Sequence, residues 1–281
     1  MKDRVLIVGS GRCGTTILHK ILSAIPGFYC PPEVHYFDHV LLKRLTVIND
    51  YIIFNKNFSN WKKYVLDNHI LKVLQNEKPS TRKEAINYFI KLMDHNAKLS
   101  NKKIWLEKTP AHLFFIKQIE KYTDKICYIH VIRDPKSTIA SLVKVGRKYP
   151  KDWKGYSSVK KSYNYVKKAL EESNKHIGKS NHYFFVYERF IKNPRSEIFR
   201  LLNWMNLNIT KKNLDHIISK GMNKEILYKG EDWKKNYGSK ISVDRNQQFI
   251  SILNKFQIQY VTKYIDYTDK LYDAICNSIS D

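Results

Sequence analysis

A glycine-rich loop near the start of the 281-residue chain has the spacing of a phosphate-binding loop. It runs from Gly9 to Gly14 and reads Gly-Ser-Gly-Arg-Cys-Gly. The mostly apolar residues 4–8 precede it, and apolar side chains recur at helical spacing over residues 17–25 after it. A strand, a glycine loop and a helix in this order aim successive backbone N–H groups at one point, which favours an anion as the ligand.

The residues inside this loop favour an anion other than a nucleoside triphosphate. A nucleotide triphosphatase has Lys and then Ser or Thr after the last loop glycine, whereas this chain has Thr15 and Thr16. The cation lies inside the loop instead, as Arg12. We therefore expect an anion held by backbone amides, threonine hydroxyls and one guanidinium group; a tight turn without a ligand is the alternative. The expected contacts are Gly11, Arg12, Cys13, Gly14, Thr15 and Thr16.

A second candidate anion site follows the strongest apolar run of the chain. Residues 126–132, Ile-Cys-Tyr-Ile-His-Val-Ile, predict a strand, and Arg133 stands at its end. Asp134 and Pro135 then open a helix, because proline suits the first helical turn, and Ser141 lies about two turns further along. An arginine and a serine together can clamp a monophosphate. The alternative is a structural pair of Arg133 and Asp134 that caps the helix.

The elements that position these loops alternate between apolar runs and helical patterns, which is typical of a parallel sheet with helices on both faces. Further strands are expected at 103–106 and 182–186. Helices are expected at 111–121, 136–146, 156–178 and 195–206, with helix-like patches at 61–76 and 82–99 and a helical tail from 208. We predict one three-layer, mostly parallel, P-loop-like α/β domain over residues 1–281, with a helical insert at about 45–100 and an irregular basic loop at 221–243. Ligands bind beyond the carboxyl ends of the strands in such a sheet.

The charge balance favours anionic partners but also has a simpler explanation. The chain has 50 Lys and Arg residues against 26 Asp and Glu, a formal net charge of +24. Such a chain attracts nucleic acid, acidic lipid, anionic sugar or nucleotide. Only 10 of the 50 basic residues are arginine, the residue preferred for phosphate recognition. Most of the charge therefore fits a solvated lysine surface.

Two features of the sequence favour a cytoplasmic protein. The apolar run at the start is too short for a membrane span or a signal peptide, so no transmembrane segment is expected. The four cysteines are widely spaced and form no CxxC pair, which argues against both a disulfide framework and a zinc site.

The two candidate anion sites resemble those of the sulfotransferases that use 3′-phosphoadenosine 5′-phosphosulfate (PAPS). The first loop is similar to their 5′-phosphosulfate loop, and residues 133–141 are similar to their 3′-phosphate motif. Residues 32–38, Pro-Glu-Val-His-Tyr-Phe-Asp, resemble the Glu-Val-His-Phe-Phe segment of heparan sulfate sulfotransferases. Residues 105–110 resemble their Glu-Lys-Ser/Thr-Pro segment, and residues 185–194 their Tyr-Glu segment with its later proline. The resemblance covers roughly residues 4–40, 103–145 and 182–207.

The resemblance implies roles for particular residues. Glu33 is the implied catalytic base with His35 beside it, and Lys108 and Arg12 are the implied contacts of the transferring sulfonate. For Glu33 a surface or helix-start carboxylate is the alternative, and for His35 a packed or supporting histidine. The phenol- and steroid-type branch has a histidine just after the matching lysine, where this chain has Thr109, so that branch fits poorly.

A late basic segment completes the implied nucleotide site. Lys229 and Gly230 lie in residues 228–234, which resemble a family segment that closes over the 3′-phosphate; a solvated basic loop is the alternative.

The function that the resemblance implies is sulfuryl transfer from PAPS to a hydroxyl or amine of an acceptor, with PAP as product and no metal required. A carbohydrate or glycolipid is the expected acceptor, and no nucleic-acid partner is expected. A P-loop kinase acting on a small molecule is the alternative, disfavoured by Thr15 at the lysine position. A noncatalytic protein that binds nucleic acid or an acidic polymer is the third hypothesis, with no nucleic-acid motif to support it.

Overall fold

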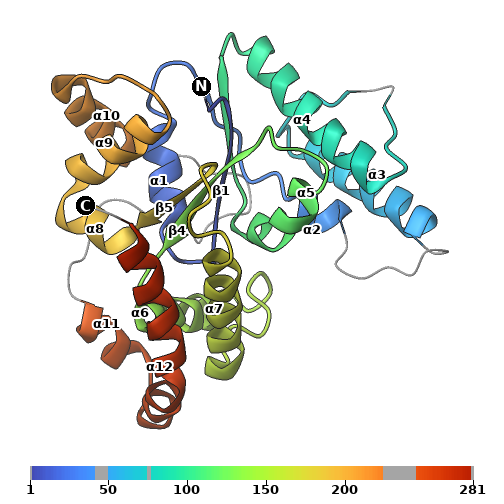
Figure 1. Cartoon of the computed structure of the whole chain (residues 1–281). Helices are drawn as coiled ribbons and strands as arrows, with labels where there is room; N and C mark the ends of the chain where they lie inside the picture. The colour runs from blue at the N-terminus through green and yellow to red at the C-terminus, as the bar shows by residue number, and fades with distance from the viewer. Residues whose placement is uncertain (1, 42–49, 75–76, 224–244, 280–281) are drawn as a thin grey trace.

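The computed structural model describes residues 2–41, 50–74, 77–223 and 245–279, and a parallel sheet of five strands lies at its centre (Figure 1). The strand order is β2-β3-β1-β4-β5, and all four neighbouring pairs are parallel. The predicted mostly parallel α/β architecture with flanking helices is therefore confirmed. The strands are β1 (Arg4–Gly9), β2 (Phe28–Tyr29), β3 (Ile104–Lys108), β4 (Cys127–Ile132) and β5 (His182–Val186).

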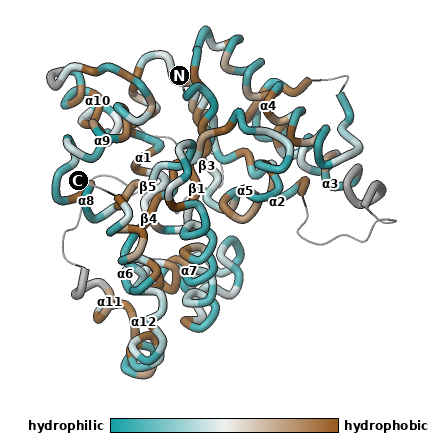
Figure 2. The backbone as a smooth tube through the Cα atoms, viewed as in Figure 1, coloured by the Kyte–Doolittle hydropathy of each residue, from teal (hydrophilic) through white to brown (hydrophobic). Residues whose placement is uncertain are grey.

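Side chains of β1 alternate between two apolar cores, one on each face of the sheet. Val5 and Ile7 pack with α1 (Thr15–Leu22), α9 (Pro194–Trp204) and α10 (Lys211–Asn223). Leu6 and Val8 face the opposite core. The elements of that core are α2 (Tyr36–Val40), α3 (Asp50–Asp67), α4 (Arg82–Leu99), the 3-10 helix η1 (Pro110–Phe115) and α5 (Ile116–Glu120). Burial on both faces explains why the strands are almost continuously apolar, as the brown stretches in Figure 2 show.

A third apolar core ties the C-terminal helices to the end of the sheet. Ile132 of β4 and Phe184 of β5 pack with α6 (Pro135–Lys148) and α7 (Val159–Asn174). The long helix α12 (Lys255–Ser278) lies against both of these helices, and α11 (Arg245–Ile252) contacts α6. Helix α8 (Tyr187–Lys192) directly follows β5. The tail is therefore part of the packed domain in the portion that is described (Figure 1).

The predicted helix-like patch at 61–76 is wrong over residues 68–74, which are not helical, and residues 75–76 lie outside the described residues. Helix α3 ends at Asp67, because His69 adopts a left-handed conformation with φ of 53°. The Ile70 amide then donates to the Val65 carbonyl at 2.9 Å, and the His69 amide donates to the Leu66 carbonyl at 3.1 Å. These two bonds form the Schellman motif that commonly terminates helices.

The other predicted strands and helices agree with the structure to within a few residues. Of the irregular basic loop predicted at 221–243, residues 221–223 belong to α10 and the rest lies outside the described residues. The strand at 182–186 and the helix at 82–99 have the predicted bounds. The helix expected at 111–121 is divided into η1 and the short α5, and the helix expected at 156–178 is α7, which begins after Ser158. The two-residue strand β2 is absent from the predicted set because it is too short to show a period.

Among the described helices, none is both long enough and apolar enough to cross a membrane. All four cysteines are free thiols.

Candidate active site

The predicted site residues gather at the carboxyl edge of the sheet. The strands are parallel, so their ends meet: Lys108 of β3 pairs with Ile7, and Gly9 of β1 pairs with Val131 of β4. The glycine loop, Arg133 and the segment that contains Glu33 each follow a strand at this edge. This is the edge at which open α/β sheets bind ligands.

The glycine loop turns tightly between β1 and α1 and depends on Gly14. This residue has φ of 106°, and a Cβ there would lie 2.5 Å from the Tyr187 ring, so only glycine fits. Helix α1 begins at Thr15, so its first backbone N–H groups face the carboxyl edge. Thr15 is buried and Thr16 is half-buried. The loop has the geometry expected of an anion cradle.

Two predicted loop contacts have other partners in this structure. The Cys13 side chain is fully buried in the core beneath α1, and its amide donates to the Ser10 carbonyl at 3.4 Å. Burial raises the pKa of the Cys13 thiol to about 11, so the thiol is neutral at physiological pH. The Gly11 amide donates to the Tyr165 hydroxyl at 3.1 Å. Tyr165 was not predicted, because no local signal marks a residue on α7 as a neighbour of the loop.

The structure brings Arg12, Arg133 and Ser141 together. Arg133 Nη1 donates to the Arg12 carbonyl at 3.0 Å, and Arg12 Nε donates to Ser141 Oγ at 3.3 Å. Burial lowers the pKa of Arg12 to about 10, and the nearby charge of Arg133 adds to this effect. Arg133 also lies over the Tyr187 ring, 4.7 Å from its centroid, and its buried Nε has no hydrogen-bond partner among the described residues. A bound anion would offset the repulsion between the two guanidinium groups and would accept a hydrogen bond from Arg133 Nε.

The structure also brings Glu33, Lys108 and His35 together. Lys108 Nζ donates to Glu33 Oε1, and His35 Nε2 lies 3.3 Å from Glu33 Oε2. Lys108 is only 3% exposed, so its charge is directed into the protein at the end of β3. Glu33 follows two prolines and lies on the same edge as the glycine loop. The carboxylate therefore has a cation on one side and an imidazole on the other.

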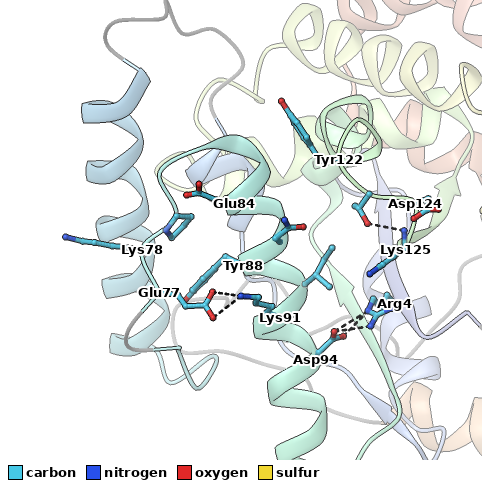
Figure 3. Close-up of a pocket in the computed structure, with 14 residues that line it drawn as sticks. Arg4, Glu77, Lys78, Glu84, Tyr88, Lys91, Asp94, Tyr122, Asp124 and Lys125 are labelled. Atoms are coloured by element: carbon cyan, nitrogen blue, oxygen red, sulfur yellow. Dashed lines mark hydrogen bonds and ion pairs between the residues drawn. The ribbon is translucent and has the colours of Figure 1, made fainter.

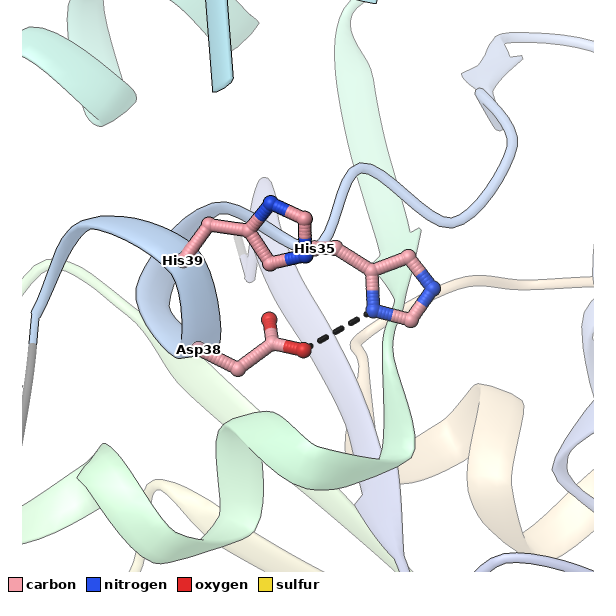
Figure 4. Close-up of side chains that lie close together, drawn as sticks. All are labelled: His35, Asp38 and His39. Carbon is pink, nitrogen blue, oxygen red and sulfur yellow. Dashed lines mark hydrogen bonds and ion pairs between the residues drawn. The ribbon is translucent and has the colours of Figure 1, made fainter. Parts of the chain in front are cut away.

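His35 occupies a constrained position at the start of α2. It is the N-cap residue and has a left-handed conformation, with φ of 49°. Its Nδ1 lies 2.9 Å from Asp38 Oδ2. The dashed line in Figure 4 marks this contact. Burial would lower the pKa of His35, but hydrogen bonds with Asp38 and Glu33 outweigh burial and raise it to about 10. His35, Asp38 and His39 each offer an atom of a type that binds metal ions, and these atoms lie within 4.8 Å of one another. Because His35 Nδ1 already faces Asp38, the arrangement serves ion pairing.

A second group with metal-ligand chemistry lies away from this site. Glu120, His176 and His182 offer ligand atoms within 4.8 Å of one another. The two imidazole rings are stacked at 4.5 Å with an interplanar angle of 7°, so their lone pairs do not converge on one point. Lys179 Nζ lies 2.8 Å from Glu120 Oε2 and 3.1 Å from His176 Nδ1, which places an ammonium group where a cation would bind. These residues do not fit a metal as they stand.

The described cavity of about 570 Å³ lies at the opposite edge of the sheet. Arg4, which lines it, begins β1, so the cavity is at the amino ends of the strands (Figure 3). Four basic and four acidic residues line it, and two pairs of them are bonded: Arg4 Nε donates to Asp94 at 3.0 Å, and Lys91 Nζ donates to Glu77 at 3.2 Å. Because its lining has no excess of positive charge, the cavity lacks the anion-binding character of the carboxyl edge.

Two predicted contacts of the nucleotide, Lys229 and Gly230, lie outside the described residues. Among unpredicted neighbours, Tyr187 follows β5 in the segment that carries the Tyr-Glu resemblance, so its sequence position was a usable signal. Tyr165 belongs to the surroundings of the glycine loop, because its hydroxyl accepts from the Gly11 amide. Burial, with the neighbouring Tyr156, raises the pKa of Tyr165 well above its usual value.

The sequence matches the model of the sulfotransferase family over residues 4–211. The chain therefore belongs to the sulfotransferase family, and the protein is an enzyme of that class. The match spans the glycine loop, the Glu33 segment, the Lys108 segment and the Arg133 segment, so every described part of the site lies inside it.

Three solved structures share the fold. The sulfotransferase domain of the curacin biosynthetic pathway is 16% identical, with a TM-score of 0.56 over 94% of this chain and 98% of that one. The sulfotransferase domain of the Synechococcus PCC 7002 olefin synthase is 15% identical, with a TM-score of 0.52 over 93% and 94%. Mouse sulfotransferase SULT7A1, complexed with PAP, is 14% identical, with a TM-score of 0.51 over 99% and 90%. A comparison with curated proteins finds no match.

Proposed function

We propose that this sulfotransferase moves a sulfuryl group from PAPS to a hydroxyl or amine of an acceptor and releases PAP. The observation that carries the proposal is the convergence of Arg12, Arg133 and Ser141 at the glycine loop. Two neighbouring guanidinium groups favour a ligand with more than one anionic group. PAP, which is bound in the SULT7A1 structure, has phosphates at two positions and is such a ligand.

The chain offers separate contacts for the two ends of the nucleotide. The N–H groups at the start of α1, with Thr15 and Thr16, are proposed to hold the 5′-phosphosulfate. Arg133 and Ser141 are proposed to hold the 3′-phosphate, with the unpartnered Arg133 Nε as one donor.

Arg12 and Lys108 are proposed to stabilise the leaving nucleotide. As the bond between sulfur and the bridging oxygen breaks, negative charge builds on that oxygen, and fixed cations aimed there lower the barrier. Because these side chains and Arg133 supply positive charge of the kind that Mg²⁺ supplies to kinases, we propose that no metal is required.

Glu33 is proposed as the general base. The new bond forms between sulfur and the acceptor oxygen or nitrogen, and the proton of that atom passes to the Glu33 carboxylate. Lys108 and His35 hold the carboxylate from both sides, which fixes its orientation before the acceptor arrives. The similarity of residues 33–37 to the heparan sulfate sulfotransferases leads us to propose a carbohydrate or glycolipid acceptor.

The proposal is tested first by calorimetric titration with PAP in the presence of EDTA. Saturable binding of one PAP per chain is expected, and no measurable affinity would contradict the proposal. Transfer is then measured with ³⁵S-labelled PAPS and a panel of desulfated heparan sulfate, a galactolipid and p-nitrophenol. Label in the polysaccharide or the lipid is expected. ATP consumption that depends on Mg²⁺, without sulfuryl transfer, would favour a kinase instead.

A further inference from the structure

Three backbone amides around the proposed base donate hydrogen bonds to side chains from one other segment. The Val34 amide donates to Glu107 Oε1 at 3.2 Å, and the His35 amide donates to Thr109 Oγ1 at 3.3 Å. The Phe37 amide lies 3.2 Å from His112 Nε2 and donates to it. The three acceptor residues, which we call the 107–112 clamp, are all fully buried. Side chains therefore accept the hydrogen bonds of the backbone amides in residues 34–37, as the carbonyl groups of a neighbouring strand do in a sheet.

The members of the 107–112 clamp also bind one another. Thr109 Oγ1 donates to Glu107 Oε1 at 2.5 Å, and His112 Nδ1 lies 3.0 Å from Glu107 Oε2. Glu107 is part of β3 and pairs with Leu6 of the central strand. The clamp is thus anchored in the middle of the sheet, and this rigid anchor limits the movement of the segment that the clamp holds.

The segment held by the clamp needs this support. His35 has a Cβ and yet adopts the left-handed conformation, which is uncommon for such residues. A strained residue persists where its surroundings fix it, and such residues cluster at functional sites. The turn at His35 brings its ring and the Glu33 carboxylate to the same side, where Lys108 also ends.

The clamp continues into the charges around His35. Asp38 Oδ2 lies 2.9 Å from His35 Nδ1, and Asp38 Oδ1 lies 3.5 Å from His112 Nε2. Because His112 Nε2 accepts from the Phe37 amide, the His112 ring is neutral and has its proton on Nδ1, the nitrogen that faces Glu107. Hydrogen bonding with His35 helps to hold the pKa of Asp38 well below its usual range against the effect of burial. Polar side chains therefore connect the clamp to Glu33 through Asp38 and His35.

We propose that Glu107, Thr109 and His112 are positioning residues for the sulfuryl transfer: they fix the backbone at 34–37 so that Glu33 and His35 share one site with Lys108. This inference rests on the proposed function, because it assigns Glu33 as the base. The inference goes further by naming the residues that fix the position of Glu33. The clamp touches neither nucleotide nor acceptor in this account, so it acts on the rate of transfer and not on nucleotide affinity.

The central test compares Thr109→Val with Thr109→Ser. Valine has the shape of threonine but lacks the hydroxyl that accepts from the His35 amide, whereas serine retains it. For Thr109→Val we expect kcat with the best acceptor of the panel to fall at least about tenfold. The Kd for PAP should stay within about twofold of the wild-type value. Thr109→Ser should recover most of the lost rate. Thr123→Val, at the distant cavity, is the matched control.

In ¹H–¹⁵N spectra, dispersed amide signals show that Thr109→Val is folded, and the titration of the His35 ring in the folded variant then tests positioning. In ¹H–¹⁵N spectra the His35 ring should titrate near pH 10 in the wild-type protein and in Thr109→Ser, but closer to the usual histidine value in Thr109→Val. Hydrogen exchange needs no variant: the Val34 and His35 amides of the wild-type protein should exchange at least about a hundredfold more slowly than free amides.

The outcomes distinguish this inference from the proposed function. If the wild-type protein transfers sulfate but Thr109→Val keeps its kcat within about twofold, the clamp is not a positioning device and the proposed function stands. Fast exchange of the Val34 and His35 amides in the wild-type protein would overturn the inference too, even if Thr109→Val fails to fold. If the wild-type protein binds no PAP, the proposed function itself fails.

Discussion

At the scale of single residues, the arginines matter more than the far more numerous lysines. Arg12 is fixed by a hydrogen bond to Ser141, and Arg133 by one to the Arg12 carbonyl, so their guanidinium groups are oriented before a ligand binds. A planar guanidinium group binds phosphate through two parallel hydrogen bonds, which an ammonium group cannot do. The arrangement thus explains how a chain with only 10 arginines among 50 basic residues can be selective for a nucleotide.

The first prediction concerns the shape of Arg133 and not only its charge. Arg133→Lys keeps the positive charge but loses the fork and the contact with the Tyr187 ring. We expect the Kd for PAP to rise by about 10- to 100-fold, which corresponds to one strong charge-assisted hydrogen bond. Calorimetry measures the change. Arg195→Lys, on an exposed side chain paired with Asp215, is the control, and equal affinities for both variants would argue against the 3′-phosphate role of Arg133.

The second prediction concerns the base. Glu33→Gln keeps the size and the hydrogen-bonding oxygen of the side chain but cannot take up a proton. The rate of transfer should fall by about 10²- to 10⁴-fold, while the Kd for PAP changes little. The measurement pairs ³⁵S transfer with calorimetry, and Glu77→Gln at the distant cavity serves as control. A Glu33→Gln enzyme with near-normal turnover would show that another group accepts the proton.

Of the predicted site residues, Arg12 lies inside the glycine loop and Arg133 directly after β4, so the parallel sheet alone brings them to one edge. Glu33, His35 and Lys108 were singled out only by the resemblance of their segments to the family. Glu107 and His112 were not found, because a buried carboxylate and a buried histidine look like ordinary core or surface residues in sequence. Their role depends on contacts with residues more than 70 positions away, which the local pattern does not encode.

At the scale of elements, a buried histidine cluster joins β4, β5 and α7. His130 Nδ1 lies 3.1 Å from Ser173 Oγ, and His130 Nε2 lies 2.8 Å from His182 Nδ1. Burial, then the charges of His182, His176 and Lys179, holds the pKa of His130 well below its usual value. Burial also lowers the pKa of His182 to about 4, against the opposing effect of the hydrogen bond that His182 donates to Glu120. Both rings are therefore neutral in the folded protein at pH 7.

The third prediction follows from this cluster. Between about pH 6.5 and pH 4 the unfolded chain protonates these histidines while the folded protein does not. The free energy of unfolding should therefore fall as the pH falls through that window, by at most about 1.4 kcal/mol per pH unit for each histidine. Urea titrations at several pH values measure it. His182→Gln should flatten the dependence, and an equally steep profile in that variant would contradict the assignment.

The opposite sign applies to His35. Its pKa is raised to about 10, so the stability that it contributes is complete below the unfolded histidine pKa and is lost as the pH rises through that value. Acid should therefore weaken the β4–β5 side of the sheet, and alkali should weaken the ion pairs of His35 beside the proposed base. The two effects can be distinguished because they occur on opposite sides of neutral pH.

The elements that could be predicted are those with a long and regular apolar period. Strand β4 was found within one residue, because seven apolar or half-apolar residues in a row have no helical alternative there. The end of α3 was missed, because the left-handed His69 that terminates it is neither glycine nor asparagine, the residues that usually signal such an end. Tertiary contacts of Ile70 with the core settle that boundary.

At the scale of the whole molecule, the fold persists while the sequence diverges. The structural matches cover more than 90% of this chain at 14–16% identity. The family match ends at residue 211, and the motif resemblance covers less. Helices α11 and α12, beyond that point, pack on α6 and α7 and extend the third core. Packing constraints of this kind tolerate almost any apolar residue, so they leave little trace in sequence.

The central claim is that the glycine loop and the two arginines form a site for a nucleotide with separate phosphates. A crystal of this protein soaked with PAP tests it most directly. The account predicts one PAP at the carboxyl edge of the sheet, with its 5′-phosphate on the amides at the start of α1 and its 3′-phosphate within hydrogen-bond distance of Arg133 and Ser141. Crystals in which PAP leaves this edge empty, or binds at the amino edge near Arg4, would contradict the account.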